Sequence, residues 1–143
     1  MKIAIGADHA GFKYKEELIS FLEDQQYEVF DYGTDSEEST DYPDYAHQVA
    51  VSVDEANFDF GILLCGSANG VAMAANKHHH IRAAICWNKE ITSLARLHNN
   101  ANIICLPAKY ITIDEAKEML LLFLTTQFEA GRHARRVGKI AIC

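Results

Sequence analysis

Short apolar runs alternate with helical segments along the whole chain, and this alternation limits the possible folds more than any other feature. Five runs have the length and flanking residues of strands: residues 2–6, 27–32, 62–64, 81–86 and 102–106. Helices are predicted over residues 13–22, 41–56, 89–97, 113–128 and 132–142, and in the small-residue segment that ends at residue 77. Such alternation is typical of a parallel sheet with helices on both faces. We expect an α/β fold, a single Rossmann-like three-layer α/β/α sandwich with a five-stranded parallel sheet, in one domain of residues 1–143.

Composition excludes several classes of function. No apolar run approaches the roughly 20 residues that cross a bilayer, and the N-terminus reads as a strand rather than a signal peptide. A formal net charge of −7 argues against non-specific nucleic-acid binding. The four cysteines lie far apart, without metal-ligand spacing, as expected of reduced thiols. We expect a cytoplasmic protein with neither a nucleic-acid nor a membrane partner.

The segment around Cys65 carries the clearest chemical signal. Cys65 ends a buried apolar run, a loop of small and polar residues begins at Gly66, and a helix follows. The N–H groups and the positive dipole end of that helix would face the loop, which favours the thiolate form of a nearby cysteine. This arrangement suggests a catalytic cysteine beside an anion-stabilising loop. Alternatively, Cys65 only ends a core strand, since cysteine is often buried.

Familiar anion-binding motifs do not fit the chain. A cysteine phosphatase loop needs arginine six positions after its cysteine, where this sequence has Val71. A P-loop needs lysine directly after its second glycine, where the sequence has Phe12. The same segment lacks the middle glycine of the dinucleotide fingerprint. We therefore expect no bound nucleotide.

Polar residues instead follow the predicted strands, where ligands bind in open parallel sheets. They are Asp8 and His9 after the first strand, Tyr42 after the second, Cys65 with Ser67 after the third, and His98 with Asn99 at the end of the helix after the fourth. Asp8 could also be only a helix cap, and His98 only a helix end.

Two clusters of basic residues need separate interpretations. Arg132 and Arg136, at i and i+4, would share a helical face and could clamp a phosphate, or they could only complement the helix dipole. In the tract of residues 78–80, three consecutive histidines point in different directions, which makes a poor single metal site. We expect that tract to be an exposed loop.

Several motifs, in order along nearly the whole chain, resemble ribose-5-phosphate isomerase type B, in the ribose and galactose 6-phosphate isomerase family. They are Gly-Ala-Asp-His-Ala-Gly at residues 6–11, Asp-Tyr-Pro-Asp-Tyr-Ala at 41–46, Cys-Gly-Ser at 65–67, Ala-Ala-Asn-Lys at 74–77, Ile-Arg-Ala-Ala at 81–84, Arg-Leu-His-Asn-Asn-Ala-Asn at 96–102 and Gly-Arg-His at 131–133. The resemblance implies a Rossmann-like dimer or tetramer, without metal or nucleotide, whose active site lies at the subunit interface. It also implies interconversion of ribose 5-phosphate and ribulose 5-phosphate in the pentose phosphate pathway.

The resemblance further implies a role for each matching residue. Cys65 would be the base that moves a proton between C2 and C1 through a cis-enediolate. His98 would open the sugar ring. The remaining assignments are Ser67 with the backbone N–H groups of Gly66, Ala68, Asn69 and Gly70 for the enediolate oxygen, Asp8 and Tyr42 for the sugar hydroxyls, His9, Arg132 and Arg136 for the phosphate, and Asn99 for contact with the substrate across the interface.

The sequence departs from the family pattern at a few positions. Ser67 replaces the usual threonine, and Ala68-Asn69-Gly70 replaces the usual Gly-x-Gly. Some relatives use a glutamate as the base, where this chain has Asn69, which leaves Cys65 in that role. Lys109 stands where arginine often reaches a neighbour's phosphate site, and preserves charge but not two-pronged geometry.

Three other functions compete with a ribose 5-phosphate isomerase. The same chemistry could act on a six-carbon sugar phosphate, such as allose 6-phosphate or galactose 6-phosphate. A non-catalytic sugar-phosphate-binding regulator would need only the phosphate clamp, so retention of Cys65, Ser67, Asp8 and His98 argues against it. A thiol redox sensor is disfavoured because no second cysteine lies nearby in sequence.

Overall fold

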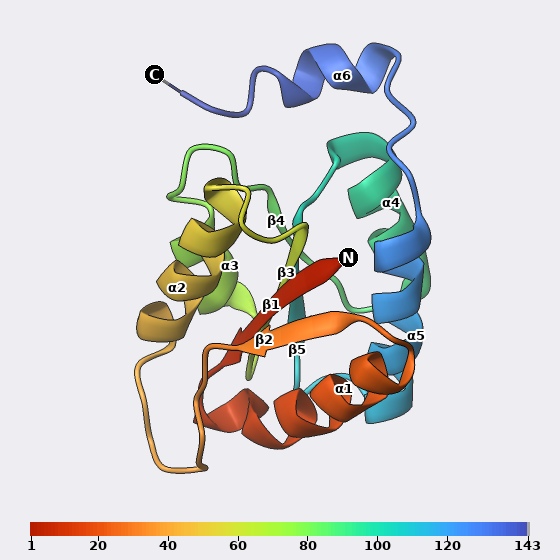
Figure 1. The fold of residues 1–143 in the computed structure, drawn as a ribbon. Coiled ribbons are helices and arrows are strands. Elements are labelled where there is room, and N and C mark those ends of the chain that lie inside the picture. The colour runs from red at the N-terminus through yellow and green to blue at the C-terminus, as the bar shows by residue number, and fades with distance from the viewer. Residues whose placement is uncertain (143) are drawn as a thin grey trace.

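The computed structural model describes residues 1–142, and its centre is a fully parallel sheet (Figure 1). The strands are β1 (Lys2–Ala7), β2 (Glu28–Asp31), β3 (Phe60–Cys65), β4 (Ala83–Ile85) and β5 (Ile103–Pro107). Their order across the sheet is β2-β1-β3-β5-β4, and every neighbouring pair is parallel. The predicted α/β fold with a five-stranded parallel sheet is confirmed.

Helices cover both faces of this sheet. One face packs against α1 (Phe12–Asp24), α4 (Lys89–Asn99) and α5 (Ile113–Thr125), and the other against α2 (Tyr42–Asp54) and α3 (Asn69–Ala75) (Figure 1). The short helix α6 (Arg132–Val137) lies beyond the end of α4. None of the helices within residues 1–142 has the length and apolar character needed to span a membrane.

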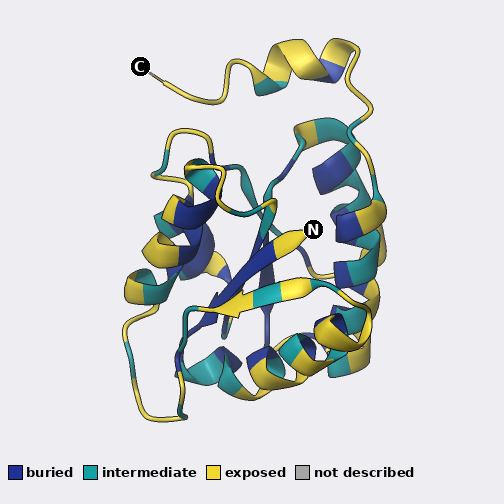
Figure 2. Cartoon of the chain, in the orientation of Figure 1, coloured by how far each residue is buried: buried dark blue, intermediate teal, exposed yellow. Residues whose placement is uncertain are grey.

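The apolar side chains of the strands form two cores, one on each face. Ile62 and Leu64 of β3 belong to the core under α1, α4 and α5, while Leu63 between them belongs to the core under α2 and α3. Alternate residues of a strand point to opposite faces, so a strand buried on both faces is apolar throughout. Figure 2 shows the result as dark blue central strands beneath helices that are buried on one side and exposed on the other.

Some elements are shorter than the sequence predicts. Helix α5 ends at Thr125, because Thr126 is extended and its carbonyl accepts a hydrogen bond from Nε of Arg96 at 3.1 Å. Helix α6 ends at Val137, and Gly138 follows it. The edge strand β4 starts only at Ala83, after Arg82, whose N–H donates to the side-chain oxygen of Asn102 at 2.8 Å.

The strand order places β1 next to β3 at the centre of the sheet. The segment after β1 leads to α1 on one face, whereas the loop after β3 leads to α3 on the other. Where successive connections leave on opposite faces, a crevice opens at the carboxyl ends of the strands. Asp8 follows β1 and Cys65 ends β3, so both residues lie at this switch point.

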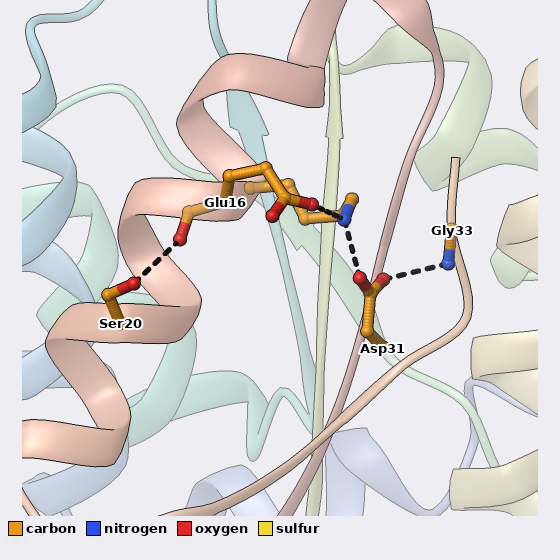
Figure 3. Close-up of polar contacts among 5 residues, drawn as sticks. Glu16, Ser20, Asp31 and Gly33 are labelled. Carbon is orange, nitrogen blue, oxygen red and sulfur yellow. Dashed lines mark hydrogen bonds and ion pairs between the residues drawn. The ribbon is translucent and has the colours of Figure 1, made fainter. Parts of the chain in front are cut away.

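A buried lysine links α1 to the last residue of β2. The Lys15 side chain is fully buried, and its Nζ lies 2.6 Å from Glu16 and 2.7 Å from Asp31. The other carboxylate oxygen of Asp31 accepts the Gly33 N–H at 2.8 Å (Figure 3). The Gly33 carbonyl in turn accepts the Ala7 N–H at 2.7 Å, next to Asp8. Because an isolated buried charge is costly, these two carboxylates are what make Lys15 tolerable there.

Candidate active site

Cys65 is the last residue of β3 and has only 5 % of its surface exposed. The segment after β5 holds the chain on both sides of it: the Ala108 N–H donates to the Cys65 carbonyl at 3.0 Å, and the Lys109 N–H donates to the Gly66 carbonyl at 3.2 Å. The carbon stem of Lys109 lies over Gly66. Lys109 therefore belongs to the same loop cluster as Cys65.

Two other cysteines have surroundings that keep them protonated. Burial raises the pKa of Cys86 to about 11, against a smaller lowering by Thr92. Burial also raises the pKa of Cys105 well above its ordinary value, with smaller contributions from Cys86 and Cys65. A protonated thiol is a poor base, so neither residue competes with Cys65 for that role.

The loop after Cys65 turns sharply before α3 begins. Ala68 has φ 66° and ψ −5°, a left-handed conformation that costs an alanine about 1–2 kcal/mol. The Ser67 hydroxyl accepts hydrogen bonds from the Asn69 side-chain amide at 3.1 Å and the Asn69 N–H at 3.4 Å. Ser67 and Asn69 are exposed, so this loop turns polar groups outward above a buried cysteine.

Tyr42 packs directly over the start of α3. A Cβ added at Gly70 would lie 2.5 Å from Cζ of Tyr42, so only glycine lets the ring approach this closely. Tyr42 is the first residue of α2, which begins after Asp41 with Pro43 in its first turn, as the sequence predicts. Tyr42 is 40 % exposed, so its side chain is accessible from solvent.

Asp8 and His9 complete the carboxyl end of the sheet. Oδ1 of Asp8 accepts the N–H groups of Ala10 at 2.9 Å and Gly11 at 3.3 Å, so Asp8 is indeed a helix cap. The Asp8 N–H donates to the Leu64 carbonyl at 3.3 Å, which ties it to β3 beside Cys65. Nδ1 of His9 accepts the Thr40 N–H at 3.2 Å. The capping interpretation and the substrate-binding one are therefore compatible.

His98 and Asn99 lie at the opposite end of the sheet. Helix α4 runs back after β4, so its last turn adjoins the amino ends of β4 and β5, where the Asn102 N–H donates to the Arg82 carbonyl at 3.0 Å. The expectation that these residues lie at the carboxyl ends of the strands is wrong within one chain. A helix that connects parallel strands must return to the amino end.

Two residues that the sequence analysis did not assign surround His98. Its ring stacks on His133 of α6, with centroids 4.1 Å apart and planes 13° apart. Nε2 of His98 lies 3.7 Å from Oε2 of Glu129. His133 lies inside the basic segment of residues 132–136, whose arginines give the stronger sequence signal. Glu129 had no local signal, because its contact depends on how the chain turns between α5 and α6.

A buried arginine holds this end of α4 in place. Arg96 is 8 % exposed, and its Nη1 donates to the Ala101 carbonyl at 2.6 Å and to the Asn100 side chain at 3.0 Å. Its guanidinium lies 4.9 Å from the Phe60 ring centroid. Burial lowers the pKa of Arg96, with a smaller contribution from Arg82. Arg96 thus ties the end of α4 to the two residues that follow it.

Arg132 and Arg136 are exposed on α6, far along the molecule from Cys65 (Figures 1 and 2). Two hollows, of about 590 and 630 Å³, extend along α3 and β4 and share Asn76, Lys77 and Ala83. One reaches Asn69 of the Cys65 loop, and the other reaches Asn99 beside His98. The two groups of candidate residues are therefore joined by one grooved face rather than by a shared pocket.

The histidine tract of residues 78–80 is an exposed segment, as predicted, with His79 and His80 exposed and His78 half-buried. It has partners that the sequence did not reveal. Nε2 of His78 lies 2.9 Å from Nδ1 of His47 on α2, and Nδ1 of His80 lies 3.2 Å from Asp54. The tract is separate from the loop at Cys65.

Comparison with known proteins agrees with this architecture. Residues 3–140 match the model of the Ribose/Galactose Isomerase family. The chain is 42 % identical to ribose-5-phosphate isomerase B of Escherichia coli, over 97 % of this chain and 93 % of that protein.

Solved structures extend the similarity to three dimensions. The Thermotoga maritima ribose 5-phosphate isomerase superposes with a TM-score of 0.96 and 49 % identity, over 98 % of this chain and 97 % of that one. The Mycoplasma genitalium ribose-5-phosphate isomerase B, solved with bound ribulose-5-phosphate, superposes with a TM-score of 0.93 and 40 % identity, over 97 % and 93 %. By its fold and by identity along nearly its whole length, the chain belongs to the ribose/galactose isomerase family.

Proposed function

We propose that this protein is an aldose–ketose isomerase that interconverts ribose 5-phosphate and ribulose 5-phosphate, a step of the pentose phosphate pathway, in one domain of residues 1–143. The observation that carries the proposal is the position of Cys65, at the end of a central strand beneath a polar turn, with Asp8 and Tyr42 around it. The Mycoplasma genitalium relative with bound ribulose-5-phosphate supports a phosphorylated pentose as the substrate.

Cys65 is the base in the proposed reaction. In the opened sugar its thiolate takes the proton from C2, and the electrons pass through C2–C1 to O1, which gives a cis-enediolate. The thiol then returns the proton to C1 while the hydroxyl proton moves from O2 to O1. A positioned base contributes about 10²–10⁴-fold to such a step. Ser67 and the N–H groups of residues 66–70 stabilise the enediolate oxygen, where one well-placed donor is worth about 3–4 kcal/mol.

The remaining candidate residues bind and open the sugar. His98 opens the furanose ring, and Asp8 and Tyr42 hold its hydroxyl groups. The phosphate lies among His9, Arg132, Arg136 and Lys109, and Asn99 contacts the substrate. Phosphate contacts lie far from C1 and C2, so their binding energy can orient the reacting carbons.

This allocation requires two chains for each site, because Cys65 and His98 lie at opposite ends of the sheet. The grooved face along α3 and β4 reaches Asn69 at one end and Asn99 at the other. A two-fold axis across that face would bring the carboxyl end of one chain to the amino end of its partner. Met73 on this face and Ile142 in the C-terminal segment are 66 % and 85 % exposed, as expected of a surface that a partner covers. We therefore infer a homodimer, or a tetramer built from it, with shared sites.

Subunit mixing tests this proposal directly. The inactive variants Cys65→Ala and His98→Ala are mixed by joint unfolding and refolding, and ribose 5-phosphate turnover is measured. In a mixed dimer one site carries both defects and the other carries none, so about a quarter of wild-type activity returns. Activity that stays absent in verified mixed dimers contradicts the shared site.

The choice between five and six carbons is tested with the metal-stripped protein. Ser67 and Ala68 depart from the family pattern, and the Ser67 hydroxyl accepts a hydrogen bond from the Asn69 side chain. The hydrogen-bond donors that this loop presents to a sugar are therefore particular to this chain. We expect ketose formation from ribose 5-phosphate to exceed that from allose 6-phosphate. The reverse preference keeps the Cys65 chemistry and makes a six-carbon sugar phosphate the substrate. If both sugar phosphates bind and neither is converted, the protein is a sugar-phosphate-binding regulator instead.

A further inference from the structure

Three metal-ligating side chains converge at the amino end of the sheet, away from Cys65. They are His98 at the end of α4, His133 in α6 and Glu129 in the connection before α6. One donor atom from each lies within 4.8 Å of the other two. Zinc sites use such sets of imidazole and carboxylate ligands, with donors about 3.4 Å apart when zinc–ligand bonds are about 2.0–2.2 Å. The rings of His98 and His133 are stacked with planes 13° apart, so His98 must turn out of the stack before both rings can direct a nitrogen at one ion.

The backbone, and not chance surface proximity, brings these residues together. The Glu129 N–H donates to the Leu97 carbonyl at 3.1 Å, which places the Glu129 carboxylate beside the residue that follows Leu97, namely His98. His133 is 7 % exposed, and its ring lies against His98. The side chains of His98 and Glu129 are 38 % and 58 % exposed, so an ion has access and both can rotate. The group thus has one fixed and two adjustable ligands.

The charges around the three side chains restrict which ions can bind, because Arg132 and Arg136 lie on the same short helix as His133. The two arginines repel any cation, so only an ion with strong intrinsic affinity for imidazole can bind. Among divalent ions this favours zinc, copper, nickel and cobalt over magnesium and calcium.

We propose that His98, Glu129 and His133 form a binding site for a zinc-class divalent ion, with water completing the coordination, and that the ion competes with the sugar phosphate. The binding part stands on the geometry of this chain alone. The competition rests on the proposed function, because an ion on His98 blocks the group that opens the sugar ring. The ion is thus an inhibitor of the isomerase and not its cofactor.

Cobalt titration of the metal-stripped, full-length protein tests the binding. Bound Co²⁺ absorbs visible light according to its geometry, and a thiolate ligand adds a separate charge-transfer band in the near ultraviolet. We expect saturation near one ion per chain, without the thiolate band. Glu129→Gln and His133→Asn should each weaken Co²⁺ binding at least about tenfold. Circular dichroism confirms that each variant is folded. Glu129→Gln is an exposed and nearly isosteric change, so it still tests the site if His133→Asn does not fold.

The histidine tract provides the matched control, because it offers imidazoles outside the proposed site. A variant with His47→Gln, His78→Asn, His79→Asn and His80→Asn should bind Co²⁺ like the wild type. Three results would each overturn the proposed site. They are loss of Co²⁺ binding in this control variant, unchanged binding in Glu129→Gln, and a thiolate band in the spectrum of the bound ion.

Inhibition is measured separately with Zn²⁺. In the control variant we expect Zn²⁺ to raise the apparent KM for ribose 5-phosphate, with reversal by chelator, and Glu129→Gln should need at least about tenfold more Zn²⁺. Unchanged KM at saturating Zn²⁺ contradicts the competition. If the protein binds Co²⁺ as expected but never isomerises ribose 5-phosphate, the proposed function fails and the metal site stands.

Discussion

At the carboxyl end of the sheet, Cys65 and Asp8 are buried, and their backbone is hydrogen-bonded to neighbouring segments. At the amino end, by contrast, Arg132 and Arg136 are exposed on a six-residue helix outside the sheet. The first region is fixed by the central strands. The second is held by side chains, namely Arg96 beneath the end of α4 and the His98–His133 stack, and by the backbone bond from Glu129 to Leu97.

This difference matches two kinds of chemical task. Proton transfer at carbon requires a base and oxyanion donors held accurately, and buried strand ends provide such accuracy. Phosphate binding requires positive charge more than fixed geometry, and exposed helix ends provide it. We therefore expect changes at Cys65 to affect kcat, and changes at the exposed arginines Arg132 and Arg136 to affect KM.

The largest effect should come from Cys65→Ala, which removes the proposed base. We expect kcat to fall by about 10²–10⁴-fold while ribose 5-phosphate still binds, measured by steady-state kinetics and by calorimetric titration. Cys86→Ala is the control, since that protonated thiol takes no part in the reaction. Normal turnover in folded Cys65→Ala would remove Cys65 as the base.

Arg132→Ala should have the next largest effect, and on binding. Losing one charge-assisted contact to phosphate costs about 1.5–3 kcal/mol, which raises KM for ribose 5-phosphate about 10- to 100-fold. Arg135→Ala, on the same exposed helix, serves as the control. The comparison substrate is free ribose, for which little change is expected. An equal loss on both sugars contradicts the phosphate role.

Gly70→Ala should disturb the carboxyl end through Tyr42, since the substitution leaves the backbone N–H of residue 70 present. The new methyl group would meet the Tyr42 ring at 2.5 Å and displace it from the crevice. We expect kcat/KM to fall about tenfold with little loss of helix content, because small misplacements of substrate-contacting groups are costly. Gly138→Ala is the control, since its Cβ would meet nothing closer than 3.4 Å. Equal activity in both variants would show that Tyr42 does not need this position.

The smallest effect concerns the stability of the amino end against acid. The pKa of His133 is lowered below the ordinary value of 6.5, chiefly by burial and the charge of His98. Below pH 6.5 the unfolded chain binds more protons at this site than the folded one, so the free energy of unfolding falls as pH drops. His133→Asn should make that fall shallower between pH 7 and 5, in denaturant titrations at equal protein concentration. An unchanged pH dependence contradicts the interpretation.

Local patterns predicted much of this molecule. The strand, loop and helix around Cys65 follow from an apolar run, a glycine and small residues, and the structure shows them within a residue or two. Pro43 indicated the start of α2. The direction of α4, which separates His98 from Cys65, was also available, since a crossover helix returns to the amino end.

Contacts between distant segments could not be predicted. Lys15 reads as an ordinary helix residue, yet it is buried because Asp31 lies beside it in space. Arg96 reads as a basic residue near a helix end, yet it lies against two aromatic rings. Glu129 meets His98 only through the turn after α5. Each of these contacts depends on packing between elements, which local sequence patterns do not specify.

The buried guanidinium of Arg96 also bears on how this protein moves. It contacts the rings of Phe60 and Phe123 and bonds the carbonyls of Ala101 and Thr126, so the end of α4 cannot fray without opening the core. Amide protons there, such as that of Ala101, should therefore exchange with solvent as slowly as those of the central strands, although helix ends ordinarily exchange fast. The backbone that carries His98 would thus stay in place between catalytic cycles, with no time spent on refolding the helix end before each new substrate.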